Sequence, residues 1–308
     1  MRFFFHFIFY SLVLLAALFF QGPSQVFGEE IVVLKSQDIP VYQQALDGFR
    51  KIATGKIRDY DLKGDPKEAG KVVSAIKRTP PDLIVSIGLL ATKVAKENFL
   101  ETPIVFCMVF NPGRFSLSGE GMTGVSLDVS LPEEFSRMKA VFPEVKRVGV
   151  LYDPQKSGKI IDQAKEVSKA LGISLIPVKV SSEKELPEAL RRLPGTIDLL
   201  WMLPDSTVVT PLSIEFILLT SFENNLPIFT FSEDFVKKGA MASFSPDYET
   251  IGEEVGHIVL RVLKGESPDR IPIRSVSKNN LSINLKIAAK MGIKFTPEIL
   301  LSAKKVYE

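Results

Sequence analysis

Residues 82–113 read DLIVSIGLLATKVAKENFLETPIVFCMVFNPG, and they contain one complete strand–helix–strand unit. The apolar runs at 82–87 and 103–109 are short and continuous, as in strands that are buried on both faces. Between them, residues 89–99 carry apolar side chains at helical spacing. Gly88 ends the first run, and the turn signal NPG follows the second. This pattern predicts two parallel strands joined by a helix.

The same alternation continues on both sides of this unit. Further strands are expected at 31–35, 56–62, 146–152, 174–180, 197–202, 227–231 and 240–244, and further helices at 41–53, 66–78, 158–171, 183–193, 211–224 and 249–263. Continuous apolar strands separated by helices indicate parallel sheets that helices cover on both faces. The predicted fold class is therefore α/β, with two doubly wound, Rossmann-like lobes of similar size joined by a hinge.

The predicted domain boundaries follow the change of rhythm near the midpoint of the chain. Residues 29–125 form the N-terminal α/β lobe and residues 126–246 the C-terminal α/β lobe, with 123–126 as a connection between them. The long helix expected at 249–263 comes after the last strand of the second lobe. The tail leaves no room for a third domain, so residues 247–308 are expected to cross back and complete the first lobe.

Residues 1–28 have the pattern of a secretory signal peptide. Residues 3–20 contain no Asp, Glu, Lys or Arg, Arg2 precedes them, and the break that follows ends in Gly28. Cleavage there would leave a mature chain of residues 29–308. An uncleaved membrane anchor is the alternative, because the run approaches the roughly 18–20 residues that span a bilayer. The chain is expected in the periplasm or another extracytoplasmic space.

Composition excludes several classes of function. The formal net charge is only +2, so no strong field favours nucleic acid as a partner. The single cysteine, Cys107, rules out an intrachain disulfide framework and lies in an apolar run typical of an inert buried thiol. His6 lies in the leader, and His257 lies within a predicted helix, where a structural role is expected. No metal site is predicted.

The sequence also lacks the motifs of the common cofactor-dependent enzymes. No GxGxxG follows the first strand, and GxxxxGK[ST], HExxH and GxSxG are all missing. Acidic residues are plentiful but nothing in the sequence pairs them, so a glycosidase site is possible only by default. We therefore expect neither catalysis nor a cofactor.

Polar residues after the predicted strands are candidates for ligand binding, since ligands of open parallel sheets bind beyond the carboxyl ends of the strands. Asp205 follows the strand at 197–202, where it would either hold an ammonium group or cap the next helix; Ser206 has the same two interpretations. Free N–H groups at 88–91 would either bind a carboxylate or belong to an ordinary strand–helix junction.

Three other strand ends carry candidate residues that also have a structural interpretation. Asn111 follows the strand at 103–109 and is foremost a turn former. Tyr152 and Phe231 end strands of the second lobe, where each would stack on a ligand or cover the core.

Six runs, taken in order, carry a resemblance to a known family. They are PIVFCMVFNP (103–112), MTGVSLDVS (122–130), FPEVKRVGVLYDP (142–154), DLLWMLPDSTV (198–208), LPIFTFSEDFVKKGAMASFSPDYETIG (226–252) and LSINLKIAAKMGIKFTPEILLSA (281–303). Together they resemble the solute-binding proteins of ABC importers, in the subgroup that binds tryptophan and related aromatic amino acids. The likeness extends from about Ile31 to Val306.

The resemblance implies a type I periplasmic-binding-protein fold, with two lobes joined by three crossovers. It implies a monomer without enzymatic activity that closes on an amino-acid-like solute between the lobes and docks on a membrane permease. The resemblance assigns the amino group of the ligand to Asp205 and its carboxylate to the segment Gly88, Leu89, Leu90 and Ala91. It places Tyr152, Ser157, Phe231 and Ser232 in the wall of the second lobe.

Two departures from the family pattern concern the ligand. Leu89-Leu90-Ala91 stands where the family often has Thr-Pro-Ala, and Asn111 stands where Asp is usual. Both changes make the first-lobe side of the cleft less polar or less negative. The solute is therefore expected to differ from tryptophan, as a more apolar amino acid or a carboxylate. The alternative function is a sensory module of the same fold that presents a solute to a membrane receptor.

Overall fold

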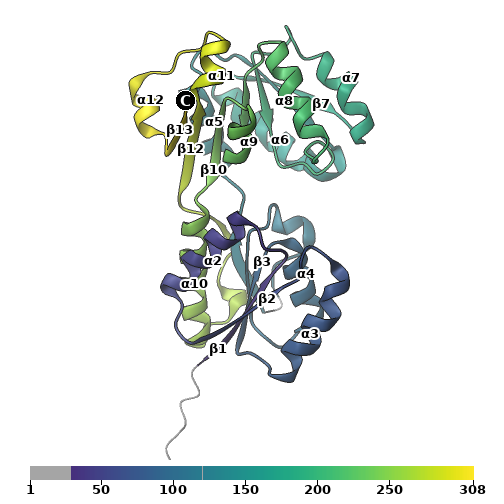
Figure 1. Cartoon of the computed structure of the whole chain (residues 1–308), viewed down its shortest axis with the longest axis vertical. Coiled ribbons are helices and arrows are strands. Elements are labelled where there is room, and N and C mark those ends of the chain that lie inside the picture. Colours follow the sequence, from purple (N-terminus) through teal and green to yellow (C-terminus); the bar gives the residue numbers. More distant parts are fainter. Residues whose placement is uncertain (1–28, 120) are drawn as a thin grey trace, which may run out of the picture.

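The computed structural model describes residues 29–119 and 121–308. The signal peptide and cleavage site predicted for residues 1–28 lie outside these residues. The described chain forms two α/β lobes, each built on its own sheet (Figure 1). The expected two-lobe α/β architecture is confirmed.

The first sheet has six parallel strands in the order β11-β5-β4-β3-β1-β2. They are β1 (Glu30–Lys35), β2 (Lys56–Asp61), β3 (Leu83–Ile87), β4 (Ile104–Cys107), β5 (Met122–Ser126) and β11 (Arg274–Ser275). Helices α2 (Pro40–Ile52) and α10 (Tyr248–Leu263) cover one face, and α3 (Ala69–Arg78) and α4 (Leu89–Asn98) cover the other.

Strand β1 explains why this sheet is covered on both sides. Ile31 and Val33 pack toward α2 and α10, whereas Val32 and Leu34 pack toward α3 and α4. Successive side chains of a strand point to opposite faces, so a continuous apolar run needs a helical layer on each face.

The second sheet has seven strands in the order β13-β12-β10-β9-β8-β6-β7. They are β6 (Arg147–Tyr152), β7 (Ser174–Lys179), β8 (Leu199–Met202), β9 (Ile228–Thr230), β10 (Ala242–Pro246), β12 (Asn279–Asn284) and β13 (Lys305–Tyr307). Strand β12 is antiparallel to β10, and the other pairs are parallel.

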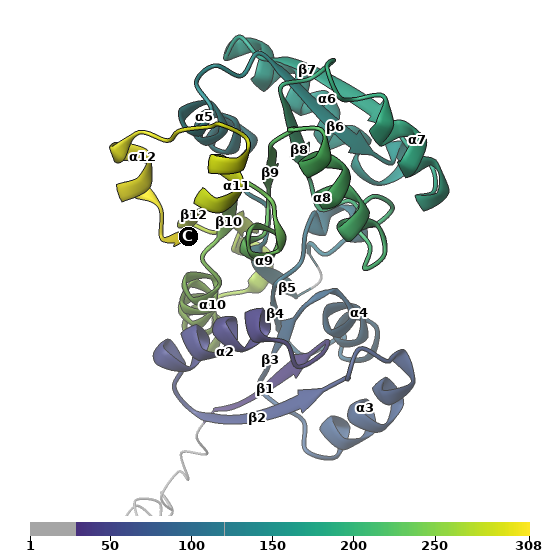
Figure 2. The ribbon, with the colours of Figure 1, turned by 45° about the horizontal axis from the view of Figure 1, so that its top comes forward.

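Helices again cover both faces of this sheet. The core on one face includes α5 (Leu131–Val141), α6 (Pro154–Ala170) and α11 (Leu285–Lys290), and the core on the other includes α7 (Leu186–Arg191), α8 (Ser213–Glu223) and α9 (Glu233–Lys238). Helix α12 (Pro297–Ser302) precedes β13, and the C-terminus lies on this lobe (Figures 1 and 2).

The chain passes between the lobes three times. It leaves the first sheet after β5, returns to that lobe between β10 and α10, and crosses back between β11 and β12. The expectation that residues 247–308 complete the first lobe is therefore right only as far as β11. From Asn279 onward it is wrong, because β12 adds to the second sheet by pairing with β10. Residues 123–126 are likewise not a connection but part of buried strand β5.

Helices α2 and α10 lie side by side in both views, although one comes near the start of the chain and the other near its end (Figures 1 and 2). Glycines make this approach possible. A Cβ atom on Gly252 would lie 1.8 Å from the Ala45 carbonyl oxygen, and one on Gly48 would lie 2.0 Å from that of Glu249. The first lobe is thus held together by a helix that enters from the second.

No helix among residues 29–119 and 121–308 is both long and apolar enough to cross a membrane.

Candidate ligand-binding site

A cavity of about 480 Å³ lies between the two lobes. This volume is in the range of small-molecule sites. Both lobes and the first crossover contribute to its lining, which consists of Phe110, Asn111, Leu127, Asp128, Val129, Ser130, Leu131, Pro132, Glu134, Ile160, Gln163, Val167, Trp201, Leu203, Pro204, Phe231, Phe244 and Pro246.

The fold places this cavity at strand ends. Phe110 and Asn111 follow β4, Pro204 follows β8, and Phe231 follows β9. The crossover at 127–130 and the start of α5 form the side where the chain passes from one lobe to the other. Motion about the crossovers would therefore change the shape of the cavity directly.

Aromatic side chains form much of the wall. Phe110 and Phe231 meet edge to face across the lobes, with ring centroids 5.7 Å apart, and Phe231 contacts Phe235 in the same way at 5.4 Å. Trp201 is buried and packs edge to face on Phe135 of α5, with centroids 4.9 Å apart. A flat apolar group would find ring faces and edges on several sides.

Glu134 is the most deeply buried charged group in the wall, at 7% exposure. Its Oε1 atom accepts a hydrogen bond of 2.8 Å from the indole Nε1 of Trp201. Burial raises the pKa of Glu134 to about 7, although the hydrogen bond from Trp201 opposes this shift. The carboxyl group is thus poised between its neutral and charged forms near neutral pH.

Asp128 and Asn111 fix the loop on the first-lobe side. The backbone N–H of Asn111 lies 3.0 Å from each carboxylate oxygen of Asp128, and Asn111 adopts a left-handed backbone with φ 47°. Burial raises the pKa of Asp128. Asn111 therefore forms the expected turn and also lines the cavity.

Asp205 lies behind the cavity wall, in a polar network at the ends of β6 and β8. It is 1% exposed, and its oxygens accept the Asp153 N–H at 2.9 Å, the Ser157 hydroxyl at 2.6 Å and the Thr207 N–H at 2.9 Å. Thr207 in turn donates its hydroxyl to Asp153 at 2.7 Å. Asp205 does not cap the next helix, because α8 begins only at Ser213 and its N-cap residue is Leu212; the contact with Thr207 closes a turn instead. Neither Asp205 nor Ser157 lines the cavity.

The segment Gly88–Ala91 begins α4 without lining the cavity. Gly88 has φ 90°, and a Cβ atom there would lie 2.4 Å from the Tyr42 hydroxyl. The N–H of Ala91 donates to the Ser36 hydroxyl at 2.9 Å, and Ala91 is fully buried, whereas Leu89 and Leu90 are half-buried. The Gly88 N–H likewise donates to the Cys107 carbonyl oxygen at 2.9 Å, so two of the four N–H groups of this segment are already bonded within the first lobe.

The other predicted residues are scattered. Phe231 lines the cavity, whereas Tyr152 is 5% exposed and packs in the core of the second lobe. Ser206 is exposed, and Ser232 lines a separate hollow of about 80 Å³. Of the predicted site residues, the structure brings only Asn111 and Phe231 together around the cavity.

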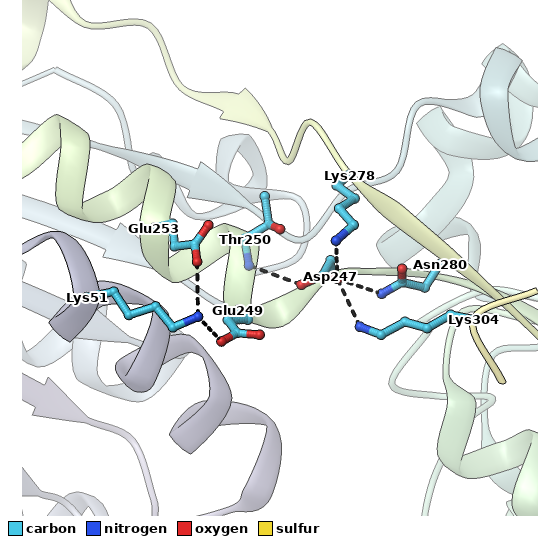
Figure 3. Close-up of polar contacts among 8 residues, drawn as sticks. All are labelled: Lys51, Asp247, Glu249, Thr250, Glu253, Lys278, Asn280 and Lys304. Atoms are coloured by element: carbon cyan, nitrogen blue, oxygen red, sulfur yellow. Dashed lines mark hydrogen bonds and ion pairs between the residues drawn. The ribbon is translucent and has the colours of Figure 1, made fainter.

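Two crossovers meet at Asp247, the residue between β10 and α10 (Figure 3). Its side chain is 4% exposed and accepts from the Thr250 N–H at 3.1 Å, Asn280 Nδ2 at 3.0 Å and Lys304 Nζ at 2.9 Å, with Lys278 Nζ at 3.3 Å. Burial alone would raise the pKa of Asp247, but these donors outweigh it and hold the pKa far below its usual range.

A second ion-pair group lies between α2 and α10. Lys51 of α2 contacts Glu249 and Glu253 of α10 (Figure 3). These ion pairs bind the first turns of α10, which begin directly after Asp247, to the first lobe.

Within residues 29–119 and 121–308, the side chains that could bind a metal or act as a redox thiol lie apart or buried. Among the described residues, no three His, Cys, Asp or Glu side chains gather as metal ligands. His257 is exposed on α10. Cys107 is 1% exposed, and burial raises the pKa of its thiol to about 12, which agrees with the inert thiol expected from the sequence.

The family model described as ABC transporter substrate binding protein matches residues 43–307. This chain belongs to that family. Its members bind a substrate and are not enzymes.

Individual relatives of this substrate-binding protein cover most of its length. A tyrosine-binding protein of Clostridioides difficile is 26% identical over 245 residues, which is 77% of this chain and 70% of the relative. A ligand-free, open substrate-binding protein with adhesive properties from Clostridium difficile has a TM-score of 0.78 at 22% identity, covering 91% and 99% of the two chains. An ABC domain in complex with L-Trp from Streptococcus pneumoniae has a TM-score of 0.70 at 22% identity, covering 90% and 99%.

Sequence reasoning missed Glu134 and Trp201 as site residues of this substrate-binding protein. The signal for α5 is present in Ser130-Leu131-Pro132-Glu133-Glu134, because a Ser, an early Pro and acidic residues mark a helix start. Nothing local shows that this helix start faces β8, because the two elements meet only after the chain has crossed between the lobes.

Proposed function

We propose that this protein is the extracytoplasmic binding component of an ABC importer and that it holds an aromatic amino acid between its lobes. The observation that carries the proposal is the interlobe cavity, with aromatic rings around it and the carboxyl groups of Asp128 and Glu134 in its wall. Rings take an aromatic side chain, and a carboxylate takes an amino group by a charge-assisted hydrogen bond.

The proposed class includes tryptophan, because Leu89-Leu90-Ala91, on which the expectation of a different solute partly rested, does not line the cavity. The relatives support this ligand class. One is named for binding tyrosine, and another was solved with L-Trp. The apolar character of the cavity agrees with the same class, because a polar or strongly charged amino acid would find few partners in such a wall.

The three crossovers suggest how binding would lead to transport. A ligand that contacts Phe110 from one lobe and Phe231 from the other gains more contacts when the lobes approach, and this difference shifts the population toward the closed form. The closed form would dock on the membrane permease. The leader at residues 1–28 would export the chain, and mass spectrometry of the mature N-terminus tests whether it begins at Glu29.

Isothermal titration of the mature protein with a panel of amino acids tests the ligand class. We expect tryptophan, tyrosine and phenylalanine to bind, and alanine, glutamate and lysine to bind at least a hundredfold more weakly. Binding of a non-aromatic amino acid alone, or of none of the panel, would reject the assignment while leaving the fold and family intact.

A further inference from the structure

The cavity presents two acidic side chains to its ligand. Asp128 and Glu134 are part of its lining, and among the described lining residues none is a Lys or Arg. The ammonium group of a ligand therefore has partners in the wall. An α-carboxylate finds no cationic side chain among these described lining residues.

The acidic groups near the cavity differ in what they already bind. Both oxygens of Asp128 face the Asn111 N–H, and the oxygens of Asp205 accept from three donors. Glu134 uses only Oε1, for the Trp201 indole. Within residues 29–119 and 121–308, no group donates a hydrogen bond to its Oε2.

The position of Glu134 is fixed by its surroundings. It lies in the first turn of α5, its neighbour Phe135 packs on Trp201, and Trp201 is held in strand β8 at 1% exposure. The Glu134 carboxyl group is therefore over nine-tenths buried, and one hydrogen-bond donor holds it in place. Its second oxygen is available to accept from a cation.

We infer that Glu134 takes the ammonium group of the ligand, and that the cavity accepts arylalkylammonium ions whether or not they carry an α-carboxylate. This inference rests on the proposed use of the interlobe cavity and names the chemistry that selects its occupant. The positive nitrogen binds Glu134 Oε2, and the aromatic body packs among Phe110, Phe231 and Phe244.

Three related compounds separate the contributions of the two ends of the ligand. Tryptophan carries both charged groups, tryptamine only the ammonium, and indole-3-propionate only the carboxylate. We expect tryptamine to bind within tenfold of tryptophan and indole-3-propionate at least a hundredfold more weakly. Equal binding of tryptophan and indole-3-propionate would overturn the inference, and so would loss of tryptamine binding while tryptophan binds.

Two neighbouring substitutions test the residue itself. Glu134→Gln removes the charge in the cavity, whereas Glu133→Gln makes the same change one residue earlier on an exposed side chain that faces Asn279. We expect Glu134→Gln to weaken tryptamine binding at least thirtyfold and Glu133→Gln less than threefold. Unchanged affinity in a folded Glu134→Gln protein would exclude Glu134.

Proton release gives a readout that a merely structural role would not produce. In the ligand-free protein, burial raises the pKa of the Glu134 carboxyl group to about 7. An ammonium group that binds Glu134 requires this carboxyl group to be deprotonated. The other charged groups around it are Asp128 in the cavity, Glu133 beside it and Arg137, whose guanidinium lies 5.5 Å from the centre of the Phe244 ring. Calorimetry at pH 7 in two buffers of different ionisation enthalpy should show proton release on binding, and none in Glu134→Gln.

The outcomes for the two proposals are distinguishable. If the wild-type protein binds tryptamine but none of the aromatic amino acids, the proposed function fails and the inference stands. If tryptophan binds equally well to wild-type protein and Glu134→Gln, the inference fails and the proposed function stands.

Discussion

The rings of Phe110 and Phe231 belong to different lobes and meet edge to face, with their centroids 5.7 Å apart. Phe110 packs against the core of the first lobe, and Phe231 follows strand β9 of the second. Both rings also line the interlobe cavity. These two side chains therefore touch across the lobes and also form part of the wall of the site.

Replacing Phe231 by alanine should weaken aromatic ligands by tenfold or more. The substitution removes a ring from the cavity and the edge-to-face contacts with Phe110 and Phe235, and buried aromatic contacts of this kind are worth about 0.5–1.5 kcal/mol beyond their area. Titration calorimetry measures the change. Phe222→Ala, which removes a half-exposed ring from α8 on the outer surface, is the control and should leave affinity unchanged. Equal losses in both variants would show that Phe231 acts only through general packing.

Glu134→Gln should stabilise the ligand-free protein at pH 8. The pKa of Glu134 is raised to about 7, so the folded state keeps a proton that the unfolded chain gives up at lower pH. Stability is therefore lost as the pH rises from about 4.5 to 7, and the full loss above that range is on the order of 3–4 kcal/mol. Urea unfolding should show that Glu134→Gln has a higher free energy of unfolding than the wild type at pH 8 and nearly the same value at pH 5. A gain of the same size at both pH values would contradict the buried charge.

Asp205→Ala should reduce stability more than it reduces affinity. Removing the carboxylate leaves the Asp153 N–H, the Ser157 hydroxyl and the Thr207 N–H without their acceptor, at a cost of about 2–4 kcal/mol. Thermal unfolding checks this, and Ser206→Ala at the exposed neighbouring position serves as control. If Asp205→Ala is as stable as the wild type but binds the ligand poorly, this prediction is wrong and Asp205 contacts the ligand.

Gly252→Ala should destabilise the first lobe by about 1–3 kcal/mol, because its Cβ would overlap the Ala45 carbonyl where α10 crosses α2. Gly158→Ala in α6 is a matched control, since nothing lies within 4 Å of a Cβ placed there. It should be neutral or stabilise by up to about 1 kcal/mol. Similar unfolding midpoints for the two variants would show that the helices can separate at no cost.

Asp247→Asn should lower stability by about 1–2 kcal/mol at pH 7, because an amide keeps the cap on Thr250 but loses the charge that holds Lys278 and Lys304. The pKa of Asp247 is held far below its usual range. Its contribution is therefore complete above about pH 4 and fades as the pH falls further. Urea unfolding from pH 7 to pH 2 should show the free energies of unfolding of the wild type and Asp247→Asn becoming equal as the pH falls.

A surface ion pair provides the comparison for that experiment. Glu253→Gln removes the 3.3 Å contact with Lys51, where both side chains are more than a third exposed, and should change stability by less than about 0.5 kcal/mol. If Glu253→Gln lowers the free energy of unfolding as much as Asp247→Asn does, burial does not make the Asp247 ion pairs stronger than the exposed Lys51–Glu253 pair.

Local patterns were sufficient to predict most strands and helices and the two-lobe architecture, because apolar period and turn residues are properties of short segments. They did not predict where the tail goes. Strand β12 has an ordinary strand sequence, and its place in the second sheet depends on antiparallel pairing with β10, from which α10 and β11 separate it in the chain.

The candidate site was predictable only in part for a similar reason. Asn111 and Phe231 follow strands, and the rule that ligands meet strand ends led to both. The same rule also selected Asp205, and the family resemblance added Ser157, but the side chains of these two residues bond to each other behind the wall. Glu134 lies on a helix, and only the path of the crossover brings it to Trp201.

The interleaved path of the chain also has a consequence for its synthesis. The first lobe gains α10 and β11 only when the chain has been made as far as Ser275, and the second sheet gains β13 at Lys305–Tyr307. A chain emerging from the ribosome therefore carries two unfinished sheets until Ser275 has been made, and one unfinished sheet until Tyr307 has been made.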